Sequence, residues 1–175
     1  MHAVESLRAR YRSSRIFRWS VDGAVLLLVV AVVSAFQTRH HPRGELPAFT
    51  LQNLNGEPVA LSSLRGKPTL LTVWAPWCGV CKAESDNVSR AARWLGGRAN
   101  VVSVATAFSD VSQVRHEVEQ QHIDYPVLLA GEDFTQALGV EAFPTLYVLD
   151  AQGRVVGSAQ GYVTTLGFIF RALMA

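Results

Sequence analysis

The sequence predicts an α/β domain with a mixed central β-sheet flanked by helices, an N-terminal β-hairpin extension, and one transmembrane helix before the domain. Three observations support this fold class. From residue 46 onward, apolar β-prone runs alternate with segments of helical spacing. Near the end, two such runs are joined by turn residues at 150–153, which predicts antiparallel strands. A stretch without charge, residues 23–36, precedes the domain.

The N-terminal apolar segment reads "GAVLLLVVAVVSAF" from Gly23 to Phe36, and extending it back to Trp19 adds only Ser20 and Asp22 as polar interruptions. A membrane-spanning helix needs about 20 mostly apolar residues. Five arginines precede this segment and two closely follow it, so the positive-inside bias places the N-terminus in the cytoplasm and exports the domain. We therefore expect a cytoplasmic basic tail at 1–18, a transmembrane anchor at 19–37, a linker at 38–45, and a domain at 46–175.

Two alternatives to an anchor exist. Val33-Ser34-Ala35 has small residues spaced as at a signal-peptidase site, which would make the segment a cleaved signal. A buried core helix is the other, but the apolar run has no polar stripe. Export holds for anchor and signal alike, and we expect a single-pass protein of the inner (cytoplasmic) membrane with its domain on the periplasmic side. His40 and His41 then lie in a solvated tether, with a metal role as the alternative.

Charge separates the two parts of the chain. The first 43 residues carry seven arginines against two acidic residues, a net charge of +5. The remaining 132 residues carry nine basic and twelve acidic side chains, a net charge of −3. The basic character of the chain belongs to the N-terminal segment, so the domain gives no reason to expect nucleic-acid binding.

The elements of the first half of the domain follow from local signals. Asn55-Gly56 between two short apolar runs predicts a hairpin over 49–61. A helical turn follows and ends before Pro68. Residues 69–74, "TLLTVW", form a continuous β-prone run typical of a strand buried on both faces. Helical spacing then extends over 79–95, where Gly96-Gly97 ends the helix.

The second half alternates in the same way. Asp110 is expected to cap a helix that extends to about residue 121. Gly139 is expected to end a short helix, and Thr164 or Thr165 to cap a final helix through Leu173. The remaining runs predict strands at 100–108, 126–130, 143–150 and 154–161.

The only two cysteines, Cys78 and Cys81, lie where the strand 69–74 passes into the helix 79–95. Backbone N–H groups and the helix dipole favour a thiolate at Cys78, and about 2 kcal/mol from the dipole corresponds to a pKa lowered by roughly one unit. Cys81 lies one turn later on the same face, within bonding reach but more covered. The pair is therefore expected to cycle between dithiol and disulfide, with Cys78 attacking and Cys81 resolving.

Other uses of two cysteines fit less well. A structural zinc site normally needs four ligands, and no second cysteine pair or spaced histidine pair is present. A structural disulfide gains little from so short a loop. A copper-binding chaperone, with the cysteines as soft ligands beside a histidine, is the main rival function. A peroxidase is a weaker one.

The stretch "VWAPWCGVCK", together with Phe143-Pro144-Thr145, resembles the thioredoxin superfamily. The longer segment from Leu46 to Cys78 is similar to the membrane-anchored TlpA/ResA branch. The dipeptide Gly79-Val80 and the overall layout resemble the copper-sensitivity-suppressor D (ScsD-like) group. The resemblance covers residues 46–175 and implies a thioredoxin-like fold.

The resemblance also assigns roles. It implies that Cys78 is the nucleophile and Cys81 the resolving thiol, with Gly79 and Val80 between them and Trp77 beside the site. Pro144 would be a cis-proline that packs against the disulfide, and its neighbourhood, including Phe143, would present backbone to a substrate. An ordinary proline at the start of a strand is the alternative. The family needs no cofactor beyond the redox-active disulfide and no metal.

The sequence departs from thioredoxin at one position. Thioredoxin has a buried aspartate six residues before the first cysteine, and this chain has Thr72 there, which cannot accept a proton. In the TlpA/ResA branch a glutamate three residues after the second cysteine serves near the site, and Glu84 occupies that position. Its alternative is a solvated helix glutamate.

The function predicted from these features is an exported, membrane-tethered thiol–disulfide oxidoreductase. Its partners would be cysteine pairs in other exported proteins and a transmembrane electron donor or acceptor. The TlpA/ResA resemblance favours a reductant or isomerase, acting in cytochrome maturation, copper handling or stress repair. The same residues also suit an oxidant, since direction depends on the reduction potential.

Overall fold

The structure, a computed structural model, describes residues 15–37 and 41–175. The chain divides into two compact units, residues 1–39 and 40–175. The described part of the first unit is one helix, α2 (Arg15–Gln37), which contains the segment expected to be the anchor. By length and composition, Ile16–Val33 is suited to cross a membrane. A signal sequence near the N-terminus meets the same criteria. Most of the expected basic tail, residues 1–14, lies outside the described residues.

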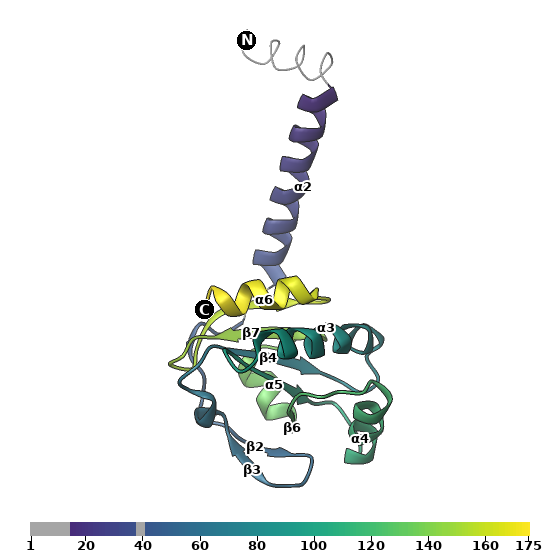
Figure 1. The fold of residues 1–175 in the computed structure, drawn as a ribbon, viewed down its shortest axis with the longest axis vertical. Coiled ribbons are helices and arrows are strands. Elements are labelled where there is room, and N and C mark those ends of the chain that lie inside the picture. Colours follow the sequence, from purple (N-terminus) through teal and green to yellow (C-terminus); the bar gives the residue numbers. More distant parts are fainter. Residues whose placement is uncertain (1–14, 38–40) are drawn as a thin grey trace. The chain divides into compact units, whose positions relative to one another are not determined.

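The second unit is built on one mixed, eight-stranded sheet (Figure 1). Its strand order is β1-β8-β7-β4-β5-β6-β2-β3. The three central strands β4, β5 and β6 are parallel, and all other pairs are antiparallel. The strands are β1 (Gly44–Glu45), β2 (Thr50–Asn53), β3 (Pro58–Ala60), β4 (Thr69–Trp74), β5 (Asn100–Ala105), β6 (Val127–Leu129), β7 (Thr145–Leu149) and β8 (Arg154–Gln160).

Helices cover both faces of the sheet (Figure 1). Apolar side chains of α3 and α6 pack on one face, against Leu70 and Leu146. Phe134 and Leu138 of α5 pack on the other, against Leu71 and neighbouring strand residues. All six residues of β4 are buried, as a central strand between two layers requires. The helices of this unit are η1 (Leu61–Leu64, 3-10), α3 (Gly79–Leu95), α4 (Val111–Gln120), α5 (Glu132–Leu138) and α6 (Thr165–Leu173).

The predicted fold class is confirmed, including the N-terminal hairpin. Predicted helix ends are confirmed where a side chain or a glycine specifies them. Asp110 accepts a hydrogen bond from the Ser112 N–H at the start of α4, and Gly96, with φ +55°, ends α3. The strand predicted for 100–108 is shorter, because β5 ends at Ala105 and Ala107 takes a left-handed backbone conformation, φ +52°.

The expected linker also differs from the prediction at its C-terminal end. Gly44 pairs with Val155 in β8, so two of its residues extend the sheet. His41 is only 6% exposed, and its ring lies 5.2 Å from the ring of Tyr147. The prediction of a solvated tether is therefore wrong for His41. The imidazole ring packs against the Tyr147 ring and is shielded from water. A histidine in the sequence does not by itself indicate such a contact.

Candidate active site

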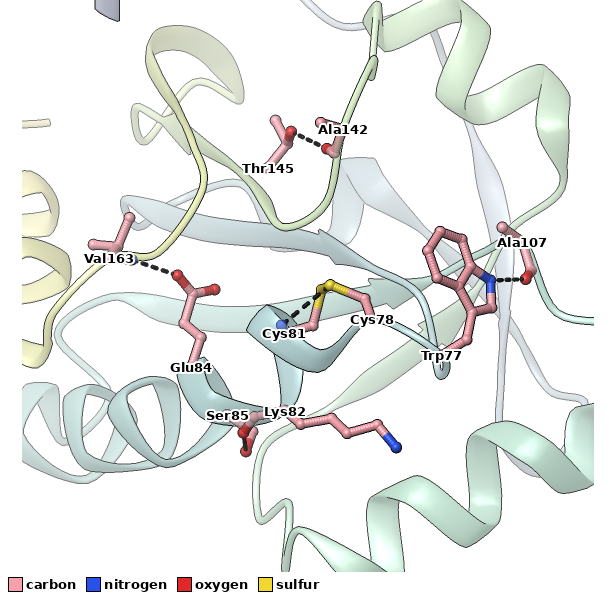
Figure 2. The surroundings of a disulfide bond; sticks show 10 residues. All are labelled: Trp77, Cys78, Cys81, Lys82, Glu84, Ser85, Ala107, Ala142, Thr145 and Val163. Carbon is pink, nitrogen blue, oxygen red and sulfur yellow. Dashed lines mark hydrogen bonds between the residues drawn. A yellow bond between two sulfur atoms is a disulfide. The ribbon is translucent and has the colours of Figure 1, made fainter.

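The two cysteines are joined in a disulfide at the point where β4 passes into α3 (Figure 2). Their Cα atoms are 5.3 Å apart. Cys78 is the N-cap residue of α3, and its Sγ accepts a hydrogen bond of 3.1 Å from the Cys81 N–H. The first turn of the helix thus directs a backbone N–H at the first sulfur, as expected for a group that favours a thiolate.

The exposure of the two cysteines differs less than expected. Cys78 is 7% exposed and Cys81 is 6% exposed, so in the oxidised protein the predicted difference in coverage is very small. Both sulfurs share one small apolar cluster with Trp74 and Ala75. The difference between them lies in their neighbours rather than in total exposure.

On the outer side of the disulfide, apolar residues lie exposed. Trp77 is 66% exposed and Val80 is 49% exposed. The Trp77 Nε1–H donates a hydrogen bond of 2.8 Å to the carbonyl oxygen of Ala107, and its ring meets the Phe143 ring edge-on at 5.8 Å. Figure 2 shows the indole nitrogen directed at the Ala107 carbonyl. Trp77 therefore connects the loop after β5 with the segment before β7.

The peptide bond between Phe143 and Pro144 is cis, as predicted. Pro144 is buried, and its carbonyl oxygen accepts a hydrogen bond of 2.8 Å from the Gly161 N–H. Thr145 Oγ1 donates to the Ala142 carbonyl at 2.7 Å. Phe143 packs against the cluster that contains both cysteines. The structure thus brings Trp77, the two cysteines and the Phe143–Pro144 segment together.

Glu84 lies on the inner side of the disulfide and is only 2% exposed, so it is not a solvated helix glutamate. Its Oε1 accepts a hydrogen bond of 2.6 Å from the Val163 N–H (Figure 2). Burial raises the pKa of Glu84 to about 7, although the Val163 hydrogen bond opposes that shift. A carboxyl group with this pKa exchanges protons readily near neutral pH.

A small cavity connects Cys81 with Glu84. Its volume is about 10 Å³, which is close to the space that one water molecule occupies. Thr72 lines it as well, and the buried Thr72 Oγ1 has no hydrogen-bond partner among the described residues. Thr72 therefore offers a hydroxyl where thioredoxin has a carboxylate, and the carboxylate is supplied from α3 instead.

Sequence reasoning missed the other side of this cavity. Lys82 Nζ forms an ion pair of 2.7 Å with Oε2 of the buried Glu117 on α4. Gln121 Nε2 donates to Glu117 Oε1 at 3.0 Å. All three residues line the cavity with Cys81 and Glu84. The only signal in the sequence was that Glu117 occupies a helical position on the side of α4 that faces the core.

No described group of three or more histidine, cysteine, aspartate or glutamate residues is arranged to hold a metal ion. Cys78 and Cys81 are engaged with each other. What the described arrangement provides is a disulfide with an apolar surface outside it and a protonatable carboxyl group behind it. This chemistry is thiol–disulfide exchange.

Comparison with known proteins agrees with this chemistry. The chain matches the Redoxin family over residues 42–167. It is 29% identical to the thioredoxin-like protein YneN of Bacillus subtilis over 122 residues, which are 69% of this chain and 72% of YneN. It is 27% identical to the thiol-disulfide oxidoreductase ResA of the same organism, over 69% of this chain and 68% of ResA.

Solved structures give the same result. One is a secreted disulfide oxidoreductase of Mycobacterium tuberculosis, described as homologous to Escherichia coli DsbE. Its TM-score is 0.62 at 25% identity, covering 73% of this chain and 96% of that one. The match to the Redoxin family, the named oxidoreductase relatives and the disulfide at the start of α3 lead to one conclusion. The chain belongs to the Redoxin family, as a thiol–disulfide oxidoreductase of the ResA- and DsbE-like type.

Proposed function

We propose that this enzyme is tethered to the inner membrane by α2 and exchanges disulfides with cysteine pairs of other exported proteins, as a reductant or isomerase. The observation that carries the proposal is the Cys78–Cys81 disulfide, which has exposed apolar residues on one side and the buried Glu84 on the other. Such a site suits protein clients, because an exposed tryptophan and valine offer contact area to a polypeptide.

The reaction divides between the two cysteines. The Cys78 thiolate attacks one sulfur of a client disulfide, which forms a mixed disulfide and releases the first client thiolate. Cys81 then loses its proton to Glu84 and attacks the Cys78 sulfur, which releases the second client thiolate. Two electrons pass to the client, and the enzyme is left with the Cys78–Cys81 disulfide. A membrane-borne thiol donor must reduce that disulfide before the next cycle.

Tethering is supported by the length and composition of Ile16–Val33 and by the arginines before it. Export is supported by the relative described as secreted. The test is protease added outside spheroplasts, with the mature N-terminus sequenced. We expect digestion of the domain and an N-terminus that retains the arginines. A mature N-terminus at Phe36 would contradict tethering and leave a released enzyme.

The direction of electron flow is tested by the reduction potential of the cysteine pair, measured in glutathione buffers. A reductant is expected near the potential of thioredoxin, about −270 mV, and an oxidant near that of DsbA, about −120 mV. A value near the second would overturn the reducing direction. The ScsD-like dipeptide Gly79-Val80 further suggests exported proteins of copper handling as one set of clients.

A further inference from the structure

A groove on the surface begins next to the active site and is not needed for thiol chemistry itself. It encloses about 800 Å³ and lies over the junction of β2 and β6, where Gln52 pairs with Leu129. One of its walls belongs to the N-terminal hairpin, through residues of β2. Its apolar lining includes Phe49, Phe108, Val111, Leu129 and Phe143.

The groove is continuous with the active site through Phe143. This side chain lines the groove, packs against the cluster that contains Cys78 and Cys81, and meets the ring of Trp77. The groove also includes residues that directly follow β5 and β6. The carboxyl ends of parallel strands are where open α/β sheets bind their ligands.

The loop after β5 is held in an unusual conformation at this point. Ala107 has φ +52°, a left-handed conformation that is unfavourable for an L-residue with a β-carbon. Its carbonyl oxygen accepts the Trp77 Nε1–H, and Ala107 itself lines the groove. A strained residue thus joins the edge of the active site to the groove.

The charge of the groove is one-sided. Glu132 and Asp133, in the first turn of α5, are both exposed, and they are the only charged residues in its described lining. No lysine or arginine of the described lining neutralises them. A ligand with apolar and basic groups complements this surface.

We propose that this groove binds the segment of a client polypeptide that adjoins its reactive cysteine. Apolar client side chains lie in the groove, and a client lysine or arginine lies at Glu132 and Asp133. The inference deepens the proposed function and rests on it, because it assigns the class of client: cysteines near apolar residues with a neighbouring basic residue.

The test uses the full-length, reduced protein in detergent and three peptides of equal length. Each peptide has one cysteine joined through a disulfide bond to a chromogenic aromatic thiol. The first has apolar residues and a lysine, the second replaces the lysine with glutamate, and the third replaces the apolar residues with serine. Attack by Cys78 on the peptide sulfur releases the coloured thiolate, which leaves readily because its pKa is low. We expect the first peptide to react on the order of tenfold faster than the other two at low salt.

Variants assign this preference to the groove. E132Q/D133N should reduce the preference for lysine over glutamate to about twofold, and added salt should do the same in the wild type. T50W, at an exposed groove position, should slow the apolar peptide to the rate of the serine peptide. D86N/E119Q removes two exposed acidic residues outside the groove lining and should retain the wild-type preference.

Reaction with a small aromatic disulfide distinguishes failure of the groove proposal from failure of the proposed function. We expect it to be unchanged in all these variants. Wild-type protein that exchanges with the small disulfide but treats the three peptides alike would overturn the groove and leave the proposed function intact. Equal loss of preference in D86N/E119Q and E132Q/D133N would also overturn it. A protein that exchanges with none of the four compounds would overturn the proposed function, and this inference with it.

Discussion

The two sides of the Cys78–Cys81 disulfide differ in almost every physical property. Outside it, Trp77 is 66% exposed and contacts two other segments of the chain. Inside it, Glu84 is 2% exposed and Thr72 is 4% exposed, and both line a cavity with the volume of one water molecule. The cysteines themselves are nearly equal in exposure.

This difference shows how one turn of helix can meet two unrelated requirements. A client must be recognised by contact area, which needs exposed apolar surface. The resolving thiol must lose a proton, which needs a group with a pKa near the working pH. Burial raises the pKa of Glu84 to about 7 against the opposing hydrogen bond from the Val163 N–H. Recognition is therefore expected to depend on the outer side, and proton transfer on the inner side.

The largest expected effect comes from the cysteines. Cys78→Ser should reduce disulfide exchange by on the order of a thousandfold or more, since the attacking sulfur is lost. Cys81→Ser should be equally inactive in turnover, but it should accumulate mixed disulfides with client proteins. Non-reducing gels and mass spectrometry of the adducts measure this. Equal trapping by both variants would contradict the assigned roles.

The second effect concerns the inner side. Glu84→Gln removes the proton acceptor and should slow resolution of the mixed disulfide by about a hundredfold near pH 7, within the range usual for general base catalysis. The pH profile of resolution should also lose its inflection near 7. Stopped-flow measurements from pH 5 to pH 9 test both points. A profile shared by Glu84→Gln and wild type would show that Glu84 only fills space.

The same substitution, which slows resolution, should increase the stability of the folded protein at pH values above 7. The pKa of Glu84 is about 7 in the folded protein against 4.5 as the ordinary value, so between these values the unfolded state binds fewer protons. Stability should therefore fall as pH rises from 4.5 to 7. The full loss, 7 − 4.5 = 2.5 pKa units at about 1.4 kcal/mol each, is roughly 3.5 kcal/mol, and roughly 2 to 3 kcal/mol of it occurs between pH 4.5 and 7.

Glu84→Gln should remove this pH dependence and be the more stable protein at pH 8. Urea unfolding of the oxidised proteins at pH 5 and pH 8 measures it. Glu119→Gln, at an exposed position on α4, serves as the control and should behave like wild type. A Glu84→Gln variant less stable than wild type at pH 8 would contradict the burial account.

The smallest effect is expected on the outer side. Trp77→Ala should slow formation of the mixed disulfide severalfold, because the client loses contact area and the Phe143 ring loses its neighbour. Trp77→Phe keeps an aromatic contact surface and loses only the hydrogen bond to the Ala107 carbonyl, so a smaller loss of about twofold is expected. Rates of client trapping under single-turnover conditions compare them. Faster trapping by Trp77→Ala would contradict a recognition role.

Local signals in the sequence predicted most of the fold. Asp110 and Gly96 specify where helices begin and end, and Asn55-Gly56 specifies the hairpin. Cys78 and Cys81 were identified from their spacing at the start of α3. Glu84, one turn further along that helix, was named from the family resemblance. For Pro144, a resemblance was needed, since nothing in the local sequence connects it with the two cysteines.

The contacts that were missed join distant segments. Glu84 binds the Val163 N–H across 79 residues, and Trp77 binds the Ala107 carbonyl across 30 residues. The ion pair of Lys82 with Glu117 crosses between two helices. Charge and hydropathy patterns carry no information about such pairs, because each side chain would be equally acceptable in solvent. The burial of His41 is a further example.

One measurement tests the division between the two sides most directly. Rapid acid quenching followed by thiol alkylation gives separate rates for the formation and the resolution of the mixed disulfide, using wild type, Trp77→Ala and Glu84→Gln with the same client. We expect Trp77→Ala to slow formation and leave resolution unchanged, and Glu84→Gln to slow resolution and leave formation unchanged. Both substitutions slowing the same step would contradict this division.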